Sequence, residues 1–232
     1  FHAVFDGAPF AAAPAANQTN DLGKAVAGSD AFSLALNLSN LTFKNLAALH
    51  FEPKAGTLVD SWQAGKQGKH VTTFDAAYAL VALQIFQRAQ DALPVGYAAG
   101  DNGELNLKTQ QGQQALELVR KQADFILGKL VGTNGLVHDG LTLGGKLDAG
   151  QSIDAQFAAI RGLTAAFLAT SDAKYRTAAR ELFIAADKAY FNAKAGTWLA
   201  GKQGEYTPWT QAAISGALRS AMLNLRNEGA EK

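Results

Sequence analysis

Two aspartates stand at matching places in two similar loops of the chain. Asp60 ends the segment GTLVD, and Asp139 ends the segment GLVHD, in which His138 precedes it. Hydrolysis of a glycosidic bond needs two carboxylates roughly 5 to 10 Å apart, and a neighbouring histidine can move protons. Asp60, Asp139, His138 and a third carboxylate, Glu205, are therefore the candidate catalytic residues. The alternative is that both aspartates cap turns, as aspartate commonly does beside glycine, and that Glu205 is a solvated loop charge.

Aromatic and basic side chains gather in the same regions. All three tryptophans fall in the long loops or at the start of a predicted helix, and exposed rings beside polar groups suit a sugar surface. The candidate substrate-binding residues are Trp62, Trp198, Tyr206, Trp209, Lys66 and Lys202. A lyase acting on a uronate would use Tyr206 or a histidine as base, with the lysines neutralising the carboxylate. The alternative is that Trp62 and Trp198 anchor their loops against the helix ends, because residues repeated in a duplicated loop usually serve its packing.

Composition excludes several other kinds of site. The 232 residues include no cysteine, and the four histidines show no HxxxH or HxH spacing, so we expect no metal and no cofactor. The net charge of +1 and the scattered basic residues argue against a nucleic-acid partner. No apolar stretch reaches the roughly 18 to 20 residues of a transmembrane helix, and no nucleotide-binding or serine-hydrolase motif occurs.

Two loops of the chain have closely similar sequences. FEPKAGTLVDSWQAGKQG at residues 51–68 shares KAGT and AGKQG with FNAKAGTWLAGKQG at residues 191–204, and residues 132–152 are a diverged copy. Duplication of a structural unit explains this pattern.

Helical patterns surround each of these loops. Before each loop we predict an amphipathic, solvent-facing helix; the three are residues 30–50, 107–130 and 173–190. After each loop we predict an inner helix, apolar nearly all round; these are residues 74–91, 153–169 and 209–225. Each inner helix follows a hydroxyl residue suited to N-capping (Thr73, Ser152 and Thr207).

The predicted fold is therefore all-α, built from three αα-hairpin repeats with long Gly-rich loops. The hairpins cover about residues 30–92, 106–170 and 172–228 within a repeat domain of residues 30–232. Residues 1–29, which include the Ala- and Pro-rich segment APFAAAPAANQTN, are predicted to be an extended strap or the remnant of a preceding repeat.

This pattern of hairpins resembles the α/α-toroid repeat of six-hairpin glycosidases, polysaccharide lyases and the N-acylglucosamine 2-epimerase group. The segment NGLVHDGLT, followed by an Ala/Gly-rich helix, is similar to a hairpin of α-1,6-mannanase-like toroids. The resemblance implies half of an (α/α)6 ring, with the substrate face where the long loops cover the N-terminal ends of the inner helices. It departs from the mannanase-like family in having no adjacent catalytic aspartates.

Two functions of different classes follow. The first is a carbohydrate-active or carbohydrate-binding domain of toroid type, with an oligosaccharide as ligand and its site on the long-loop face. The second is a non-catalytic helical-repeat scaffold that binds a protein partner, or the missing half of a larger chain, in an extracytoplasmic assembly. Both suit a periplasmic or secreted location. The sequence alone leaves open whether the chain is an enzyme.

Overall fold

The computed structural model describes residues 51–52, 54, 56–58, 62–63, 66–91, 107–199 and 208–224. Within them lie five α-helices: α5 (Thr73–Asp91), α6 (Leu107–Phe125), α7 (Ile153–Thr170), α8 (Ala173–Tyr190) and α9 (Pro208–Asn224). One π-helical turn, η1 (Ile126–Leu130), continues α6. None of the helices in these ranges is long and apolar enough to cross a membrane.

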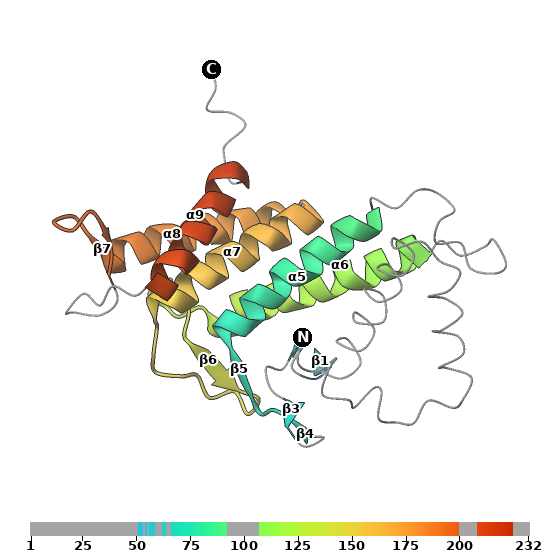
Figure 1. Ribbon diagram of the computed structural model, residues 1–232. Coiled ribbons are helices and arrows are strands. Elements are labelled where there is room, and N and C mark those ends of the chain that lie inside the picture. The colour runs from blue at the N-terminus through green and yellow to red at the C-terminus, as the bar shows by residue number, and fades with distance from the viewer. Residues whose placement is uncertain are drawn as a thin grey trace.

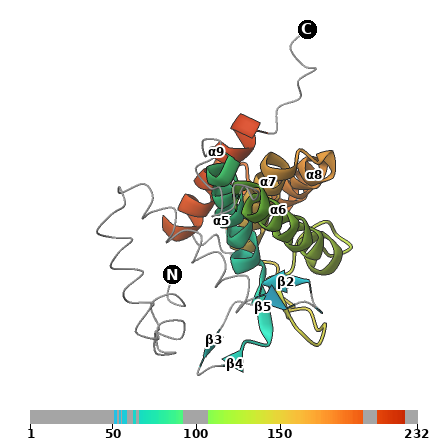
Figure 2. The ribbon, with the colours of Figure 1, turned by 90° about the vertical axis from the view of Figure 1, so that its right-hand side faces the viewer.

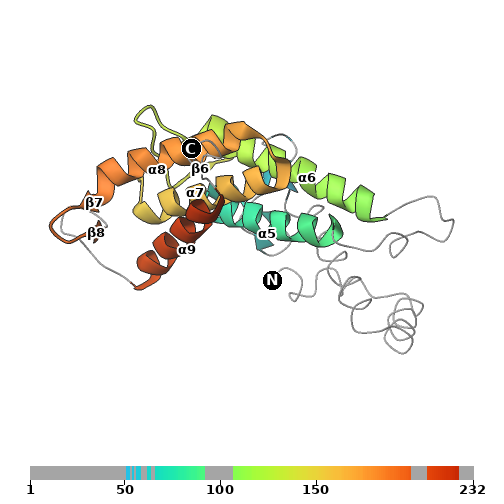
Figure 3. The same ribbon diagram turned by 90° about the horizontal axis from the view of Figure 1, so that it is seen from above.

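The helices form two layers around α7. This helix packs against α5, α6, α8 and α9, and most of its residues from Ile153 to Ala166 are buried. Seen from above, α8 and α6 lie along the upper side of the picture and α9 and α5 along the lower side (Figure 3). The view along the layers in Figure 2 places α9 and α8 on opposite sides of α7. Helices α5, α7 and α9 are therefore inner helices, and α6 and α8 are outer ones.

Short strands fill the loops that enter the inner helices. A small β-hairpin precedes α5 and another precedes α9, and the two have the same register: β1 (Phe51–Glu52) pairs with β2 (Thr57–Leu58), and β7 (Phe191–Asn192) pairs with β8 (Thr197–Trp198). Both turns carry a glycine with positive φ, Gly56 at 72° and Gly196 at 67°, which a side chain would strain. The repeated KAGT sequence thus encodes a repeated turn.

A third strand pair joins two loops that are distant in sequence. Strand β5 (His70–Thr72) pairs antiparallel with β6 (Gly140–Thr142). A fourth pair, β3 (Trp62–Gln63) with β4 (Lys66–Gln67), lies within the first loop. The β5–β6 ribbon lies beyond the N-terminal ends of α5 and α7 (Figure 1). It is the element that places residues of two different loops beside each other.

The sequence-based helices agree with these bounds to within a residue or two, apart from the π-helical end of residues 107–130. The sequence analysis predicted no strands, and that part was wrong: four two-stranded sheets occur in the described loops. The predicted outer helix at residues 30–50 and the strap at residues 1–29 lie outside the described residues. The fold is mostly helical, and the arrangement of three complete hairpins stays a prediction.

The N-cap of α5 also differs from the prediction. The Thr72 hydroxyl, not that of Thr73, accepts from the Asp75 backbone N–H at 3.0 Å and donates to the Asp75 carboxylate at 2.6 Å. Thr73 instead donates its hydroxyl to the His138 carbonyl at 2.5 Å. Ser152 caps α7 as predicted, accepting from the Ala155 N–H. Thr207 lies outside the described residues.

Candidate functional site

The β5–β6 ribbon is the base of the candidate site. His70 lies opposite Thr142, and Thr72 lies opposite Gly140. Gly140 has to be glycine, because a Cβ there would collide with the Val71 carbonyl and lie 2.9 Å from the His70 ring. The Thr73 N–H extends the contact by donating to the Asp139 carbonyl at 2.8 Å. The two loops therefore meet at atomic contact between the last residues before α5 and the middle of the loop that enters α7.

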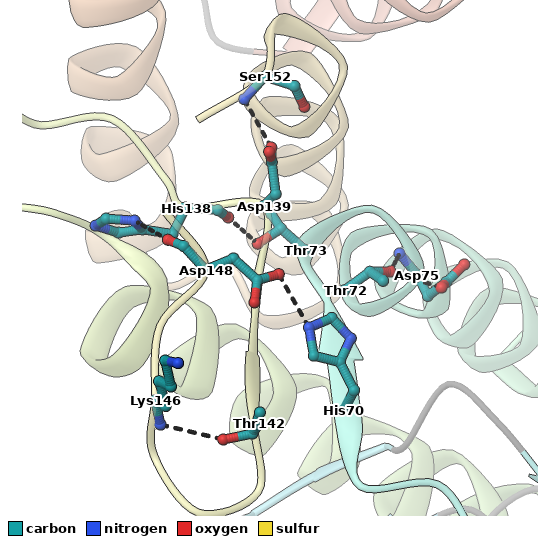
Figure 4. A network of polar contacts seen from close by, with 10 residues as sticks. All are labelled: His70, Thr72, Thr73, Asp75, His138, Asp139, Thr142, Lys146, Asp148 and Ser152. Carbon is teal, nitrogen blue, oxygen red and sulfur yellow. Dashed lines mark hydrogen bonds and ion pairs between the residues drawn. The ribbon is translucent and has the colours of Figure 1, made fainter. Parts of the chain in front are cut away.

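His70 and Asp148 face each other across this ribbon. The His70 Nε2 lies 2.9 Å from Asp148 Oδ2, and the two side chains are 39% and 35% exposed. Figure 4 shows both on the same side of β5 and β6. Asp148 is held in place because its N–H donates to the Gly140 carbonyl at 2.9 Å. An imidazole oriented by a carboxylate can accept or deliver a proton, which is the arrangement used in general acid–base catalysis.

His138 is held by its ring and by its backbone. Its Nδ1 lies 2.8 Å from the Asp148 carbonyl oxygen, and since a carbonyl only accepts, Nδ1 carries the proton. The His138 N–H donates to the Leu130 carbonyl, and its own carbonyl accepts from Thr73. Both histidine rings thus contact Asp148: His70 contacts its carboxylate, and His138 contacts its backbone carbonyl (Figure 4).

Asp139 acts on the backbone of its own loop. Its Oδ1 accepts from the Ser152 N–H at 2.6 Å, at the start of α7, and its carboxylate lies so close to Gly150 that a Cβ there would overlap it. These are the contacts expected of a capping aspartate. Asp60 lies outside the described residues, so its separation from Asp139 stays untested.

Tyr190, which the sequence analysis did not single out, approaches the same place from the end of α8. Its hydroxyl donates to the Gln151 carbonyl. Burial, and secondarily the charge of Asp139, raise the pKa of the Tyr190 phenol. No motif surrounds Tyr190, so only the packing of α8 beside the second loop reveals it.

One buried side chain of α7 holds the second loop, residues 132–152, in place. Gln156, on the first turns of α7, accepts from the Val137 N–H at 2.8 Å and donates to the Val137 carbonyl at 2.8 Å. It also donates to the Ser152 carbonyl at 3.0 Å. Because Val137 directly precedes His138, this amide sets the position of the candidate site.

The other two loops carry a glutamine contact at the corresponding residue. Each loop has a positive-φ glycine (Gly56, Gly135 and Gly196), and the residue two places later is bonded through its backbone to a glutamine. Gln122 accepts from the Leu58 N–H at 2.8 Å, and Gln211 donates to the Trp198 carbonyl at 3.4 Å. The three contacts share the loop position but differ in number, in length and in the helix that provides the glutamine, which is α6 for Gln122 and an inner helix for Gln156 and Gln211.

Trp198 is packed inward. Its Nε1–H donates to Asp187 at 3.0 Å, and its ring contacts the rings of Phe157, Phe183 and Phe191 with centroids 5.2 to 6.3 Å apart. These contacts tie the third loop to α7 and α8. A sugar would have to compete with them for the ring.

The remaining candidates fall largely outside what the structure describes. Glu205, Tyr206 and Lys202 lie beyond its ranges, and only the backbone is described for Trp62 in β3, Lys66 in β4 and Trp209 in α9. Among the described residues, no group of three or more His, Asp or Glu side chains could hold a metal ion.

The comparisons with known proteins concern the fold. No protein-family model matches the chain, and a search of curated proteins finds no match either. The helical arrangement is shared with solved structures. One is a sugar epimerase from a ruminal bacterium, with a TM-score of 0.52 and 14% sequence identity over 77% of this chain. The chain spans 46% of that epimerase chain, so the likeness is to about half of a larger helical enzyme.

Proposed function

We propose that the chain binds a carbohydrate at the long-loop end of its inner helices, next to His70 and Asp148. The observation that carries this proposal is the 2.9 Å contact between these two side chains, which come from different loops and are each more than a third exposed. A partly exposed histidine oriented by a carboxylate is a common element of sites that move protons. The likeness to a sugar epimerase fold supports the ligand class.

In this proposal His70 is the proton-transfer residue and Asp148 fixes its orientation. In the tautomer that donates its Nε2–H to Asp148, Nδ1 is the ring nitrogen that can accept a proton. Lys69 and Lys146 are exposed beside the ribbon, so an anionic sugar such as a uronate is favoured over a neutral one. Binding is the primary proposal, and a proton transfer on the bound sugar is the reaction that His70 could perform. A periplasmic or secreted location remains part of the proposal.

The test is a thermal-shift and calorimetric screen with neutral and uronic-acid oligosaccharides. A ligand that binds only the folded chain raises the melting temperature according to its occupancy. We expect a shift with the uronic-acid set that is lost in His70→Gln and Asp148→Asn. Glu181→Gln, an exposed carboxylate on α8, is the matched control and should leave the shift intact. Asp139→Asn and Trp198→Ala are poorer probes, because the first weakens and the second removes a contact that holds a loop.

The second candidate function is a scaffold without catalysis. Its support is that several polar groups of the loops bond the protein's own backbone, as Asp139 and Gln156 do. Such loops keep a shape and can present it to a protein partner. Absence of binding to every saccharide tested would rule out the carbohydrate proposal and favour the scaffold.

A further inference from the structure

The three inner helices can be compared position by position from their first residues, Thr73, Ile153 and Pro208. Gly162 of α7 packs against Ala77 of α5, so closely that a Cβ on Gly162 would lie 2.8 Å from the Ala77 carbonyl oxygen. We call the face of α5 that meets α7 its leading face and the face of α7 that meets α5 its trailing face, and we take residues three or four apart to share a face. On α5 the leading face is Ala77, Leu80 and Gln84, and on α7 the trailing face is Gly162, Ala165 and Ala169.

The leading face is buried on the first two inner helices and exposed on the third. In α5 its residues are at most 7% exposed, and the matching residues of α7 are at most 1% exposed; these are Phe157, Ile160 and Thr164. The matching residues of α9 are Ala212, Ser215 and Arg219, and all three are exposed. Nothing in the described part of the chain covers this face of α9.

The opposite pattern holds for the trailing face. On α7 Gly162 and Ala165 are buried, and on α9 Ala217 is fully buried. The matching residues of α5 are Ala82, Ile85 and Ala89, which are all exposed, Ile85 at 61%. The chain therefore carries both sides of one helix–helix contact, one side on α5 and the other on α9, and neither is used within the described fold.

The composition of both faces is that of an internal repeat. Terminal repeats of helical arrays usually carry a polar outer face, whereas these faces consist mainly of alanine, serine and isoleucine. Arg219 is the one charged member, and its aliphatic stem can lie along a neighbouring helix with its head in water. Small residues allow the close approach that Gly162 and Ala77 already show.

We propose that two copies of this chain associate head to tail, with α9 of each copy packed against α5 of the other. By the equivalence with Ala77 and Gly162, Ala212 of one copy lies against Ala82 of its partner. Two such contacts, related by a two-fold axis, close the assembly and leave no leading or trailing face exposed. The net charge of +1 per chain opposes such pairing very little.

Two further observations agree with this assembly. The chain spans 46% of the sugar epimerase structure that shares its fold, so two copies together are about as long as that chain. In addition, an apolar groove of about 290 Å³ runs between α8 and α9 at the same edge. It is lined by Arg180, Phe183, Ile184, Leu218, Ala221 and Met222. In the proposed dimer this groove borders the contact between α9 and the partner's α5.

Sedimentation equilibrium of the 232-residue chain tests the proposal. The expected mass is twice the 24.4 kDa of one chain. Ala82→Glu and Ala212→Glu each place a charge in both contacts and should weaken association about a hundredfold or more. Both residues are exposed in one copy, so the helical circular dichroism of each variant should match the wild type. Ala189→Glu, an exposed alanine of α8 away from α9, is the control and should dimerise normally.

Mixing the two variants distinguishes head-to-tail pairing from other dimers. A mixed pair has one contact with no substitution and one with both, so an equimolar mixture should recover part of the association that each variant alone has lost. An interface made of two α9 helices would show no such recovery. A monomeric wild type at about 100 micromolar or a mass above two copies would overturn the proposal. So would an Ala82→Glu or Ala212→Glu variant that dimerises like the wild type, or a mixture of these two without recovery.

Discussion

Replacing Gln156 with leucine isolates the energetic role of one buried amide. The Gln156 side chain is fully buried, and so is Val137. Leucine has a similar size but leaves the Val137 N–H and carbonyl without their 2.8 Å partners. Each buried backbone group that loses its hydrogen bond costs about 1 to 3 kcal/mol. We expect Gln156→Leu to lower the free energy of unfolding by about 3 kcal/mol.

Urea unfolding followed by circular dichroism measures this change. With a denaturant slope of about 3 kcal/mol per M, the midpoint should fall by about 1 M while the slope stays the same. Gln211→Leu is the matched control, since this glutamine occupies the corresponding position on α9, is partly exposed and makes a single 3.4 Å bond. It should cost under about 1 kcal/mol. Equal losses in the two variants would refute the argument that Val137 needs both bonds.

Two other predictions concern the ribbon and the pH dependence of stability. Gly140→Ala should destabilise the fold by about 2 to 4 kcal/mol in the same urea experiment. It should also separate His70 from Asp148, because the new Cβ meets the backbone of β5. The control Gly144→Ala should be tolerated, since a Cβ at this position has no neighbour nearer than 3.7 Å. Burial, and then the hydrogen bond to Asp124, raise the pKa of Tyr175 to about 12 from its ordinary value of 10. The folded state thus favours the protonated phenol, so this contribution is complete below pH 10 and is lost between pH 10 and 12. Tyr175→Phe should flatten the loss of stability over that range in alkaline unfolding titrations, and an unchanged profile would contradict the assignment.

The helices were predictable because their signals are local. Residues 173–190 have an amphipathic pattern after the capping Asp172, and the helix occupies those same residues. The inner helices carry apolar residues all round, which indicates burial on several sides, and α7 is buried on several sides. Periodicity of this kind depends on neighbours three and four residues apart, which one sequence displays fully.

The strands and the candidate site depend on pairings that one sequence does not display. Strand β5 has three residues, too few for an alternating pattern, and its partner β6 lies in another loop, about 70 residues further along the chain. His70 and Asp148 are 78 positions apart. The sequence placed both in the long loops, but their contact depends on the register of the ribbon. That register is set by the close approach at Gly140, which no local pattern announces.

The capping of α5 shows the same limit at a smaller scale. Thr72 and Thr73 are adjacent and chemically equal, so the sequence offers two N-caps. The structure uses Thr72 for the helix and Thr73 for the second loop. Asp75 decides which threonine becomes the N-cap, because its backbone N–H and its carboxylate both bond the hydroxyl of Thr72, three positions earlier.

The glutamine under the second loop also bears on how such a protein can change over evolutionary time. Gln156 bonds only backbone atoms of the loop, at Val137 and Ser152. Every amino acid except proline offers the same N–H and carbonyl, so this bond does not depend on which side chains the loop carries. Exposed positions such as Thr133, Gly144 and Lys146 can therefore be substituted while the path of the backbone is kept. A fold held in this way can acquire a new binding specificity by a few loop substitutions without first losing its stability.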